Sequence, residues 1–319
     1  MEVDVMNHFG ILKRFSDVPY FENEKSKKLM DDLHFSIRLG GIVVVTGLSC
    51  SGKTTLLDKT LKKLQEEKNI IVCRSLSTEK QAVSIPLIFS AFFSDLVKEK
   101  NIGSYMKAEK KERKLIELLN KHKKNLVLLI DDAHELNTQT FIGLKKIREL
   151  DKDTEGKITF ILVGQPKLSN ELNHPKNEEI GARSHMFSVL ENKAKYCEWI
   201  IKQAVSENIK PKDILNQDAI ELPGESLLTP LQVIKYLSSS LQKAYMIGVK
   251  PVTKEIVQSV LVPEINGLDA KLARNGYTNR YLCDLLNSKN NELRLFLKGQ
   301  LVGSKAQEFN QEILKLGIS

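Results

Sequence analysis

A short glycine-rich segment, residues 47–54, has the residue types and the spacing that bind phosphate. It reads Gly-Leu-Ser-Cys-Ser-Gly-Lys-Thr, a complete G-x-x-x-x-G-K-T pattern. Gly47 and Gly52 let the backbone turn its N–H groups toward a triphosphate, while Lys53 supplies a positive charge and Thr54 a hydroxyl group for magnesium. The pattern predicts that the chain binds a nucleoside triphosphate.

The segments on both sides of this phosphate loop fit the same interpretation. Residues 42–46 form a short β-branched run typical of a buried strand, and residues 55–64 place Leu57, Leu61 and Leu64 on one face of a helix. A strand, a glycine loop and a helix in this order aim the helix N-terminus at the phosphates. The residues expected to contact the nucleotide are Gly47, Leu48, Ser49, Cys50, Ser51, Gly52, Lys53, Thr54 and Thr55.

A second apolar run, residues 125–130, ends abruptly in two aspartates. A carboxylate at the C-terminal end of a buried strand holds magnesium against the phosphates in phosphate-loop NTPases, so Asp131 and Thr54 are the predicted magnesium residues. Asp132 stands where many ATPases have a glutamate that polarises the attacking water. Its side chain is shorter by one methylene, roughly 1.5 Å, which predicts slow hydrolysis. Glu135 is an alternative for this role, and His134 is either catalytic or a packing residue.

A third strand is predicted over residues 157–164, followed by Gln165 and Pro166. Its polar end should reach the same edge of the sheet as Asp131, so Gln165 is a candidate for sensing the terminal phosphate or the attacking water. Residues 69–74 predict another strand, and residues 85–98 predict a helix with one apolar face. This succession indicates an α/β protein whose parallel sheet has helices on both faces.

Length and composition leave room for two or three domains. The 319-residue chain is 41% hydrophobic, and none of its apolar stretches approaches the roughly 20 residues that cross a bilayer. The N-terminus begins with acidic residues and lacks a secretory apolar region, so we expect a cytoplasmic protein without membrane insertion. The four cysteines are far apart in the sequence, which predicts reduced thiols.

The formal net charge of +8 favours polyanionic partners. It does not by itself distinguish nucleic acid, acidic lipid and simple solubility. Lysines are densest in residues 107–124, where two interpretations exist, a DNA-facing surface or an amphipathic helix with a solvated basic face. The leucines between those charges favour the amphipathic helix.

These motifs together resemble the AAA+ ATPases of the ExeA type and their relatives, the TniB, TnsC and MuB-like transposition helpers. The resemblance spans most of residues 6–190, and residues 190–262 look like the helical lid of that family. An aspartate pair followed by Ala-His, with Val-Gly-Gln-Pro downstream, is more specific than the phosphate loop alone. The matching stretches are residues 9–11 with Phe15, residues 46–55, residues 129–136 and residues 161–168.

The resemblance implies ATP and Mg²⁺ as cofactors and a homo-oligomer, either a ring or a filament. Relatives usually carry an arginine after the Gln-Pro strand that reaches the nucleotide site of the neighbouring subunit, and Arg183 matches by position. The alternative for Arg183 is a surface arginine in a loop. Many lids of this family also carry a phosphate-sensing arginine near residues 231–232, where this chain has none. With Asp132, that difference favours a slow ATP switch over a fast motor.

The C-terminal segment predicts a separate helical unit. Residues 277–286 indicate one helix, residues 287–290 a polar break, and residues 291–299 a second helix, which is the spacing of a helix-turn-helix. Lysine, arginine and asparagine side chains at or after the break could face a DNA duplex. Helical hairpins are also common in proteins that do not touch DNA, so a protein contact is the alternative.

The sequence therefore predicts four parts with distinct tasks. Residues 1–40 are expected to pack on the ATPase core of residues 41–190, followed by a lid over residues 191–264 and a C-terminal unit over residues 265–319. The favoured function is an ATPase that assembles on double-stranded DNA and recruits or activates a transposase. The alternatives are an ExeA-like secretion-assembly ATPase and a nucleotide-gated scaffold without significant hydrolysis.

Overall fold

The computed structural model describes residues 2–67, 69–74, 84–97, 107–189, 193–261 and 267–318. The chain forms two compact units. One unit, called here the sheet unit, comprises residues 24–47 and 53–189. The other, the helical unit, comprises the N-terminal residues up to 23, residues 48–52, and the chain from 190 onward. Within the phosphate loop, residues 48–52 belong to the helical unit, whereas Gly47 and Lys53 belong to the sheet unit.

The sheet unit is built on five parallel strands in the order β2-β3-β4-β1-β5. The three central strands are apolar and almost entirely buried, as expected for a parallel sheet covered on both faces. Four of these strands confirm the predicted runs to within one residue at either end. The strands are β1 Gly41–Thr46, β2 Ile70–Arg74, β3 Asn125–Ile130, β4 Ile158–Gly164 and β5 Ser184–Ser188.

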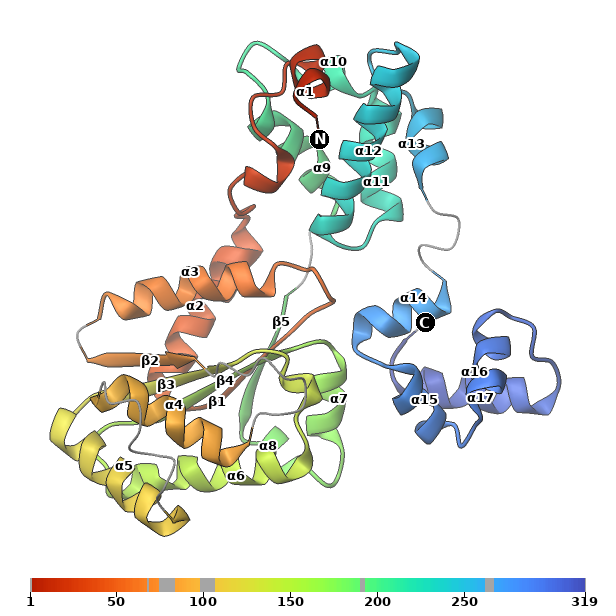
Figure 1. Ribbon diagram of the computed structural model, residues 1–319. Helices are drawn as coiled ribbons and strands as arrows, with labels where there is room; N and C mark the ends of the chain where they lie inside the picture. The colour runs from red at the N-terminus through yellow and green to blue at the C-terminus, as the bar shows by residue number, and fades with distance from the viewer. Residues whose placement is uncertain are drawn as a thin grey trace. The chain divides into compact units, whose positions relative to one another are not determined.

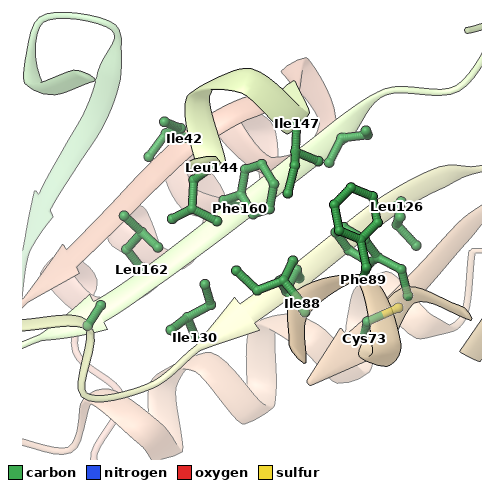
Figure 2. Close-up of a cluster of buried hydrophobic side chains, with 14 of the residues drawn as sticks. Ile42, Cys73, Ile88, Phe89, Leu126, Ile130, Leu144, Ile147, Phe160 and Leu162 are labelled. Atoms are coloured by element: carbon green, nitrogen blue, oxygen red, sulfur yellow. The ribbon is translucent and has the colours of Figure 1, made fainter. Parts of the chain in front are cut away.

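Helices cover both faces of this sheet (Figure 1). Alternate residues of each strand point to opposite faces, so Ile42 and Val44 belong to one core and Val43 and Val45 to the other side. Figure 2 shows the first core, where Phe160 of β4 lies among side chains of the helices on that face. The helices are α2 Glu24–Leu39, α3 Lys53–Gln65, α4 Ile85–Val97, α5 Ala108–His122, α6 Thr138–Glu149, α7 Lys167–Asn173 and α8 Glu178–Gly181.

Two of these helices confirm predictions made from apolar periodicity. In α3, Leu57, Leu61 and Leu64 are all buried, as the shared face requires. In α5, Leu115 and Leu119 are buried while most of the basic side chains are exposed, so the lysine-rich stretch is an amphipathic helix. The sheet unit also contains two short 3₁₀ helices, η2 Ala133–Glu135 and η3 Leu150–Asp153, and a third, η1 Phe15–Asp17, belongs to the helical unit.

Strand β5 was not predicted from the sequence. It reads Ser-His-Met-Phe-Ser, is exposed or half-buried along its whole length, and pairs with β1 alone at the edge of the sheet. An edge strand with one paired side has no need of the apolar run that marks a central strand. Arg183 directly precedes this strand, in the turn between α8 and β5, and its side chain is exposed.

The helical unit joins the N-terminal residues to the lid. Val5, Phe9 and Phe15 are buried in one cluster with residues of α9, α11 and α12, and the Leu12 N–H donates to the Ala204 carbonyl at 2.8 Å. This differs from the expectation that residues 1–40 pack as a whole on the ATPase core. Apolar side chains of residues 5–15 pack on the lid, whereas α2 packs on the sheet. The elements are α1 Val3–Phe9, α9 Lys193–Ala204, α10 Pro211–Ile214, α11 Gln217–Ser226, α12 Pro230–Ile247 and α13 Lys254–Val260.

Residues 267–318 have their own apolar core, built from Leu272, Leu282, Leu293, Phe296 and Phe309 among others. Four helices surround it: α14 Leu268–Asn275, α15 Asn279–Leu285, α16 Asn290–Leu297 and α17 Ser304–Lys315. The predicted helix over residues 277–286 begins two residues later than expected, because Thr278 caps it by accepting from the Tyr281 N–H. In the described part of the chain, no helix combines the length and the apolar character that a bilayer span would need.

Candidate nucleotide-binding site

The functional side chains follow the C-terminal ends of three adjacent strands. Strand β4 lies between β1 and β3, with Thr46 opposite Gly164 and Ile130 opposite Leu162. All three strands are parallel, so Gly47, Asp131 and Gln165 leave the sheet at the same edge. Ligands of open α/β sheets bind at this carboxyl edge. The structure thus brings together the three segments that the sequence assigned to one site.

The phosphate loop turns sharply between β1 and α3. Cys50 and Gly52 have φ of +65° and +87°, and the Ser51 N–H donates to the Leu48 carbonyl at 3.2 Å. The left-handed conformation of Gly52 accounts for the second glycine of the pattern, since glycine adopts positive φ without strain. Lys53 Nζ donates to the Gly47 carbonyl at 2.9 Å, so the ammonium group lies across the loop. Thr54 and Thr55 are exposed in the first turn of α3.

The polar atoms around the loop fit a nucleotide with its magnesium ion. Among the described residues, Ser51 Oγ of the phosphate loop and Gln165 Oε1 after β4 are buried atoms without a hydrogen-bond partner. The described residues contain no group of three or more His, Cys, Asp or Glu side chains that could hold a metal alone. Magnesium in nucleotide sites needs only one or two protein groups, with phosphates and water completing its shell. Thr54 and Asp131 fit that smaller role.

The two aspartates differ in conformation. Asp132 has φ of +50°, and its backbone N–H donates to Asp131 Oδ1 at 2.9 Å, which orients the Asp131 carboxylate. The Asp132 side chain is 72% exposed, whereas that of Glu135 is 22% exposed. The Asp132 side chain therefore extends into solvent from the strand end, whereas the Glu135 side chain in η2 is largely covered by the protein.

His134 connects these carboxylates to the end of β4. Its ring is 6% exposed; Nδ1 accepts a long bond of 3.5 Å from the Gln165 N–H, and Nε2 lies 3.6 Å from Glu135 Oε1. Burial lowers the pKa of His134, an effect that Glu135 and Asp132 oppose. The ring is therefore neutral near pH 7, with Nδ1 as the acceptor and the proton on Nε2. His134 is thus a packing residue at this strand end, and its catalytic role stays a prediction.

The turn after β4 holds a residue that the sequence did not single out. Lys167 begins α7 directly after Gln165-Pro166 and is only 8% exposed. Lys167 and Lys53 both act to lower the pKa of His134, which places their positive charges near that ring. Gly164 allows η2 and α7 to pack closely at the end of β4, because a Cβ there would lie 3.0 Å from Leu168 Cδ2 and 3.1 Å from the backbone nitrogen of His134. The sequence signal available for Lys167 was its place directly after the Gly-Gln-Pro turn. Its burial depends on how α7 packs, which the sequence does not show.

Arg183 lies at the amino-terminal ends of the strands, whereas the phosphate loop follows the carboxyl-terminal end of β1. It directly precedes β5, whose first residue, Ser184, pairs with Ile42 near the start of β1. From Ile42 to Gly47 the chain advances by five residues of strand, roughly 17 Å at 3.3–3.4 Å per residue. The structure therefore does not bring Arg183 together with the other predicted site residues of the same chain.

A pocket of about 380 Å³ surrounds Arg183 at these amino-terminal strand ends. The guanidinium group lies 3.2 Å from Glu179 Oε1, which also accepts from Lys145 Nζ at 2.6 Å. The hydrogen bond from Lys145 lowers the pKa of Glu179, so this carboxylate is ionised. The Arg183 side chain is 59% exposed, and an exposed ion pair holds it only weakly. It is thus free to exchange Glu179 for another anion.

Residues 37–172 match the family described as AAA domain. The AAA match covers the phosphate loop, both aspartates and Gln165, and the five-stranded parallel sheet with helices on both faces is the AAA+ fold. A comparison with curated protein sequences found no match. The finer resemblance to the ExeA, TniB, TnsC and MuB-like group stays a prediction.

Solved structures similar to this chain include two archaeal proteins and one animal assembly. The ADP form of the Aeropyrum pernix ORC2 protein has a TM-score of 0.59 at 13% identity, over 97% of this chain and 91% of that chain. Cdc6p from Pyrobaculum aerophilum has a TM-score of 0.54 at 16% identity, over 100% and 85%. Drosophila ORC bound to DNA has a TM-score of 0.52 at 13% identity, over 99% and 78%. At these identities the likeness shows the fold.

Proposed function

We propose that this chain is an ATP-dependent, DNA-binding regulator of the AAA+ type that acts in the cytoplasm. It assembles on duplex DNA and recruits or activates a transposase, with slow ATP hydrolysis as the timer. The observation that carries the proposal is the separation of Arg183 from the phosphate loop, which lie on opposite edges of one sheet. A complete catalytic site then needs a second copy of the chain, so nucleotide state and assembly depend on each other.

In the proposed site each residue has a separate task. Residues 47–55 hold the triphosphate through backbone N–H groups and the Lys53 ammonium, while Thr54 and Asp131 hold Mg²⁺, which neutralises phosphate charge when bound. Asp132 orients the attacking water and accepts its proton. Gln165 senses the terminal phosphate through the N–H groups of its side-chain amide, and its buried, unpaired carbonyl oxygen accepts from the attacking water.

Arg183 completes the site of a neighbouring copy. Its guanidinium group leaves Glu179 and neutralises the charge that develops on the terminal phosphate. A residue on one edge that serves a site on the other edge makes the contact head-to-tail, and such contacts generate rings or open filaments. The proposed oligomer is one of these two forms.

Duplex DNA is the proposed polyanion for the net charge of +8. Two of the proteins that share this fold have structures with DNA, Drosophila ORC and the ORC1 protein of Aeropyrum pernix, the latter at a TM-score of 0.51 and 11% identity. The transposase is proposed from the motif resemblance, in particular residues 129–136 and 161–168. The secretion-assembly and scaffold alternatives predict no DNA requirement.

Asp132→Asn is expected to keep ATP binding and to lower the hydrolysis rate by about 100-fold, because the amide no longer accepts a proton from water. Steady-state phosphate release, with ATP affinity measured on the same sample, checks this prediction. Glu135→Gln is the matched control, with the same loss of charge at the residue next to His134. Unchanged hydrolysis in Asp132→Asn together with loss in Glu135→Gln would transfer the role to Glu135.

Binding to duplex DNA is expected to require ATP and to weaken as salt rises, because phosphate contacts release counterions. The measurement is fluorescence anisotropy of a labelled random-sequence duplex, with no nucleotide, ADP, or a slowly hydrolysed ATP analogue, at several salt concentrations. The full chain should bind most tightly with the analogue. Salt-independent association, or none in any nucleotide state, would contradict the DNA proposal and favour the secretion or scaffold alternatives.

A further inference from the structure

The C-terminal unit contains a helix-turn-helix that the nucleotide site does not use. Helix α15 ends at Leu285, residues 286–289 form the turn, and α16 begins at Asn290. Asn287 has φ of +44°, a conformation that asparagine tolerates and that reverses the chain within the turn. Leu282 and Leu293, one from each helix, are buried in the same core. The second helix is thus fixed to a rigid unit by its inner face.

The outer face of α16 is polar and positively charged. Asn291, Arg294, Leu295 and Lys298 recur at three- and four-residue intervals, so they share one side of the helix, and all four are exposed. Leu293 and Phe296 lie on the opposite side and are 0% and 7% exposed. Within the described part of this unit, Asn291, Arg294 and Lys298 are therefore not explained by packing against the core.

The acidic residue of α16 does not oppose this positive face. Glu292 accepts from the Lys289 N–H at 3.1 Å and from Lys305 Nζ at 2.6 Å, and the bond from Lys305 lowers the pKa of its carboxyl group. The carboxylate is thus paired within the unit, beside the turn. Asp284 lies next to the same turn, in a polar hollow that Lys289 and Lys305 also line. Asp284 and Glu292 thus lie beside the turn, near Lys289 and Lys305, whereas the cations Arg294 and Lys298 lie on the exposed outer face of α16.

The dimensions and chemistry of this face suit the major groove of DNA. An α-helix with its side chains is about 10–12 Å in diameter, which fits a major groove about 12 Å wide, and the eight residues of α16 give a helix about 12 Å long. Asparagine pairs with the adenine edge and arginine with the guanine edge in a bidentate manner, while an exposed leucine offers an apolar contact to a thymine methyl. Lys298, one turn further on, is placed to meet backbone phosphate.

We propose that α16 is the recognition helix of a duplex-DNA-binding module formed by residues 267–318. Asn291 and Arg294 read base edges, and Lys298 contacts the phosphate backbone. This inference rests on the proposed function for its choice of DNA as the ligand, and it adds the element that binds and a dependence on base sequence. A protein partner on the same face is the competing occupant.

The test compares variants of the full chain on a labelled duplex that the parent chain selects from a random-sequence pool, with a slowly hydrolysed ATP analogue present. Arg294→Ala and Asn291→Ala are each expected to weaken DNA affinity by about 10- to 100-fold. Lys315→Ala removes one exposed positive charge from α17 of the same unit and should leave affinity within about twofold. Lys298→Ala should reduce the salt dependence of log affinity by about one phosphate contact. Thermal melting should match the parent chain, since these side chains are exposed.

The possible results separate the inference from the proposed function. Failure of the parent chain to bind any duplex would overturn both. Normal binding by the parent chain, with Arg294→Ala equal to Lys315→Ala and an unchanged salt slope in Lys298→Ala, would overturn this inference alone and leave the face to a protein partner. Selection of bound duplexes by the parent chain should yield a sequence preference that Asn291→Ala relaxes.

Discussion

Lys53→Ala abolishes the binding of Mg-ATP, with a loss of affinity of at least about 100-fold, roughly 3 kcal/mol, as the expected result. The Lys53 ammonium group lies 2.9 Å from the Gly47 carbonyl, across the loop where the phosphates are expected. Removing it takes away the point charge on the terminal phosphates while the backbone turn at Cys50 and Gly52 persists. Isothermal titration calorimetry with Mg-ATP measures the change directly.

The control for this variant is Lys62→Ala. Lys62 is an exposed lysine on the same helix, α3, nine residues further on, so it removes an equal charge away from the loop. Its ATP affinity should equal that of the parent chain. Normal ATP affinity in Lys53→Ala would contradict the assignment of residues 47–54 as a phosphate loop, and with it every role assigned to the neighbouring strand ends.

Arg183→Ala is expected to lower ATP hydrolysis by about 1,000-fold while leaving ATP affinity unchanged. The reason is the position of Arg183 before β5, at the edge of the sheet away from its own phosphate loop. It is therefore proposed to stabilise the transition state in another copy. Arg148→Ala is the matched control, since Arg148 is exposed and lines the same pocket, and it should hydrolyse ATP normally.

A mixing experiment tests the action between copies. Lys53→Ala chains keep the arginine but lack a working loop, and Arg183→Ala chains keep the loop but lack the arginine. Mixed together, they should recover a substantial part of the parental rate, because some interfaces combine an intact loop with an intact arginine. Full hydrolysis by Arg183→Ala alone, or no recovery in the mixture, would refute action between copies.

The central sheet was predictable because its strands carry their own signal. The runs at residues 42–46, 125–130 and 158–163 are continuous apolar segments, which a strand buried on both faces requires. Strand β5 lacks that signal, since it gains its place by pairing with β1 and stays exposed or half-buried. The N-terminal segment was misplaced for a related reason. Phe9 and Phe15 indicate burial, but the sequence does not say against which partner.

The candidate site likewise contains residues that the sequence predicts and residues that only the tertiary packing places there. Lys53 was predicted from the G-x-x-x-x-G-K-T pattern that follows β1. Asp131 and Gln165 were predicted because each directly follows a strand, and parallel strands bring their ends to one edge. The positions of His134 and Lys167 depend on how η2 and α7 fold back onto that edge, and their burial is a property of the tertiary packing. The neutral state of His134 follows from that burial, so it could not be inferred from neighbouring residues in the sequence.

The placement of Arg183 and the phosphate loop on opposite edges gives each molecule two unlike ends. In an open row of n copies, every internal junction joins an arginine to a loop, but one terminal loop lacks a donor and one terminal arginine lacks an acceptor. Such a row has n − 1 working junctions, whereas a closed circle has n. Turnover per molecule should therefore rise with row length in the open form and stay constant in the closed form.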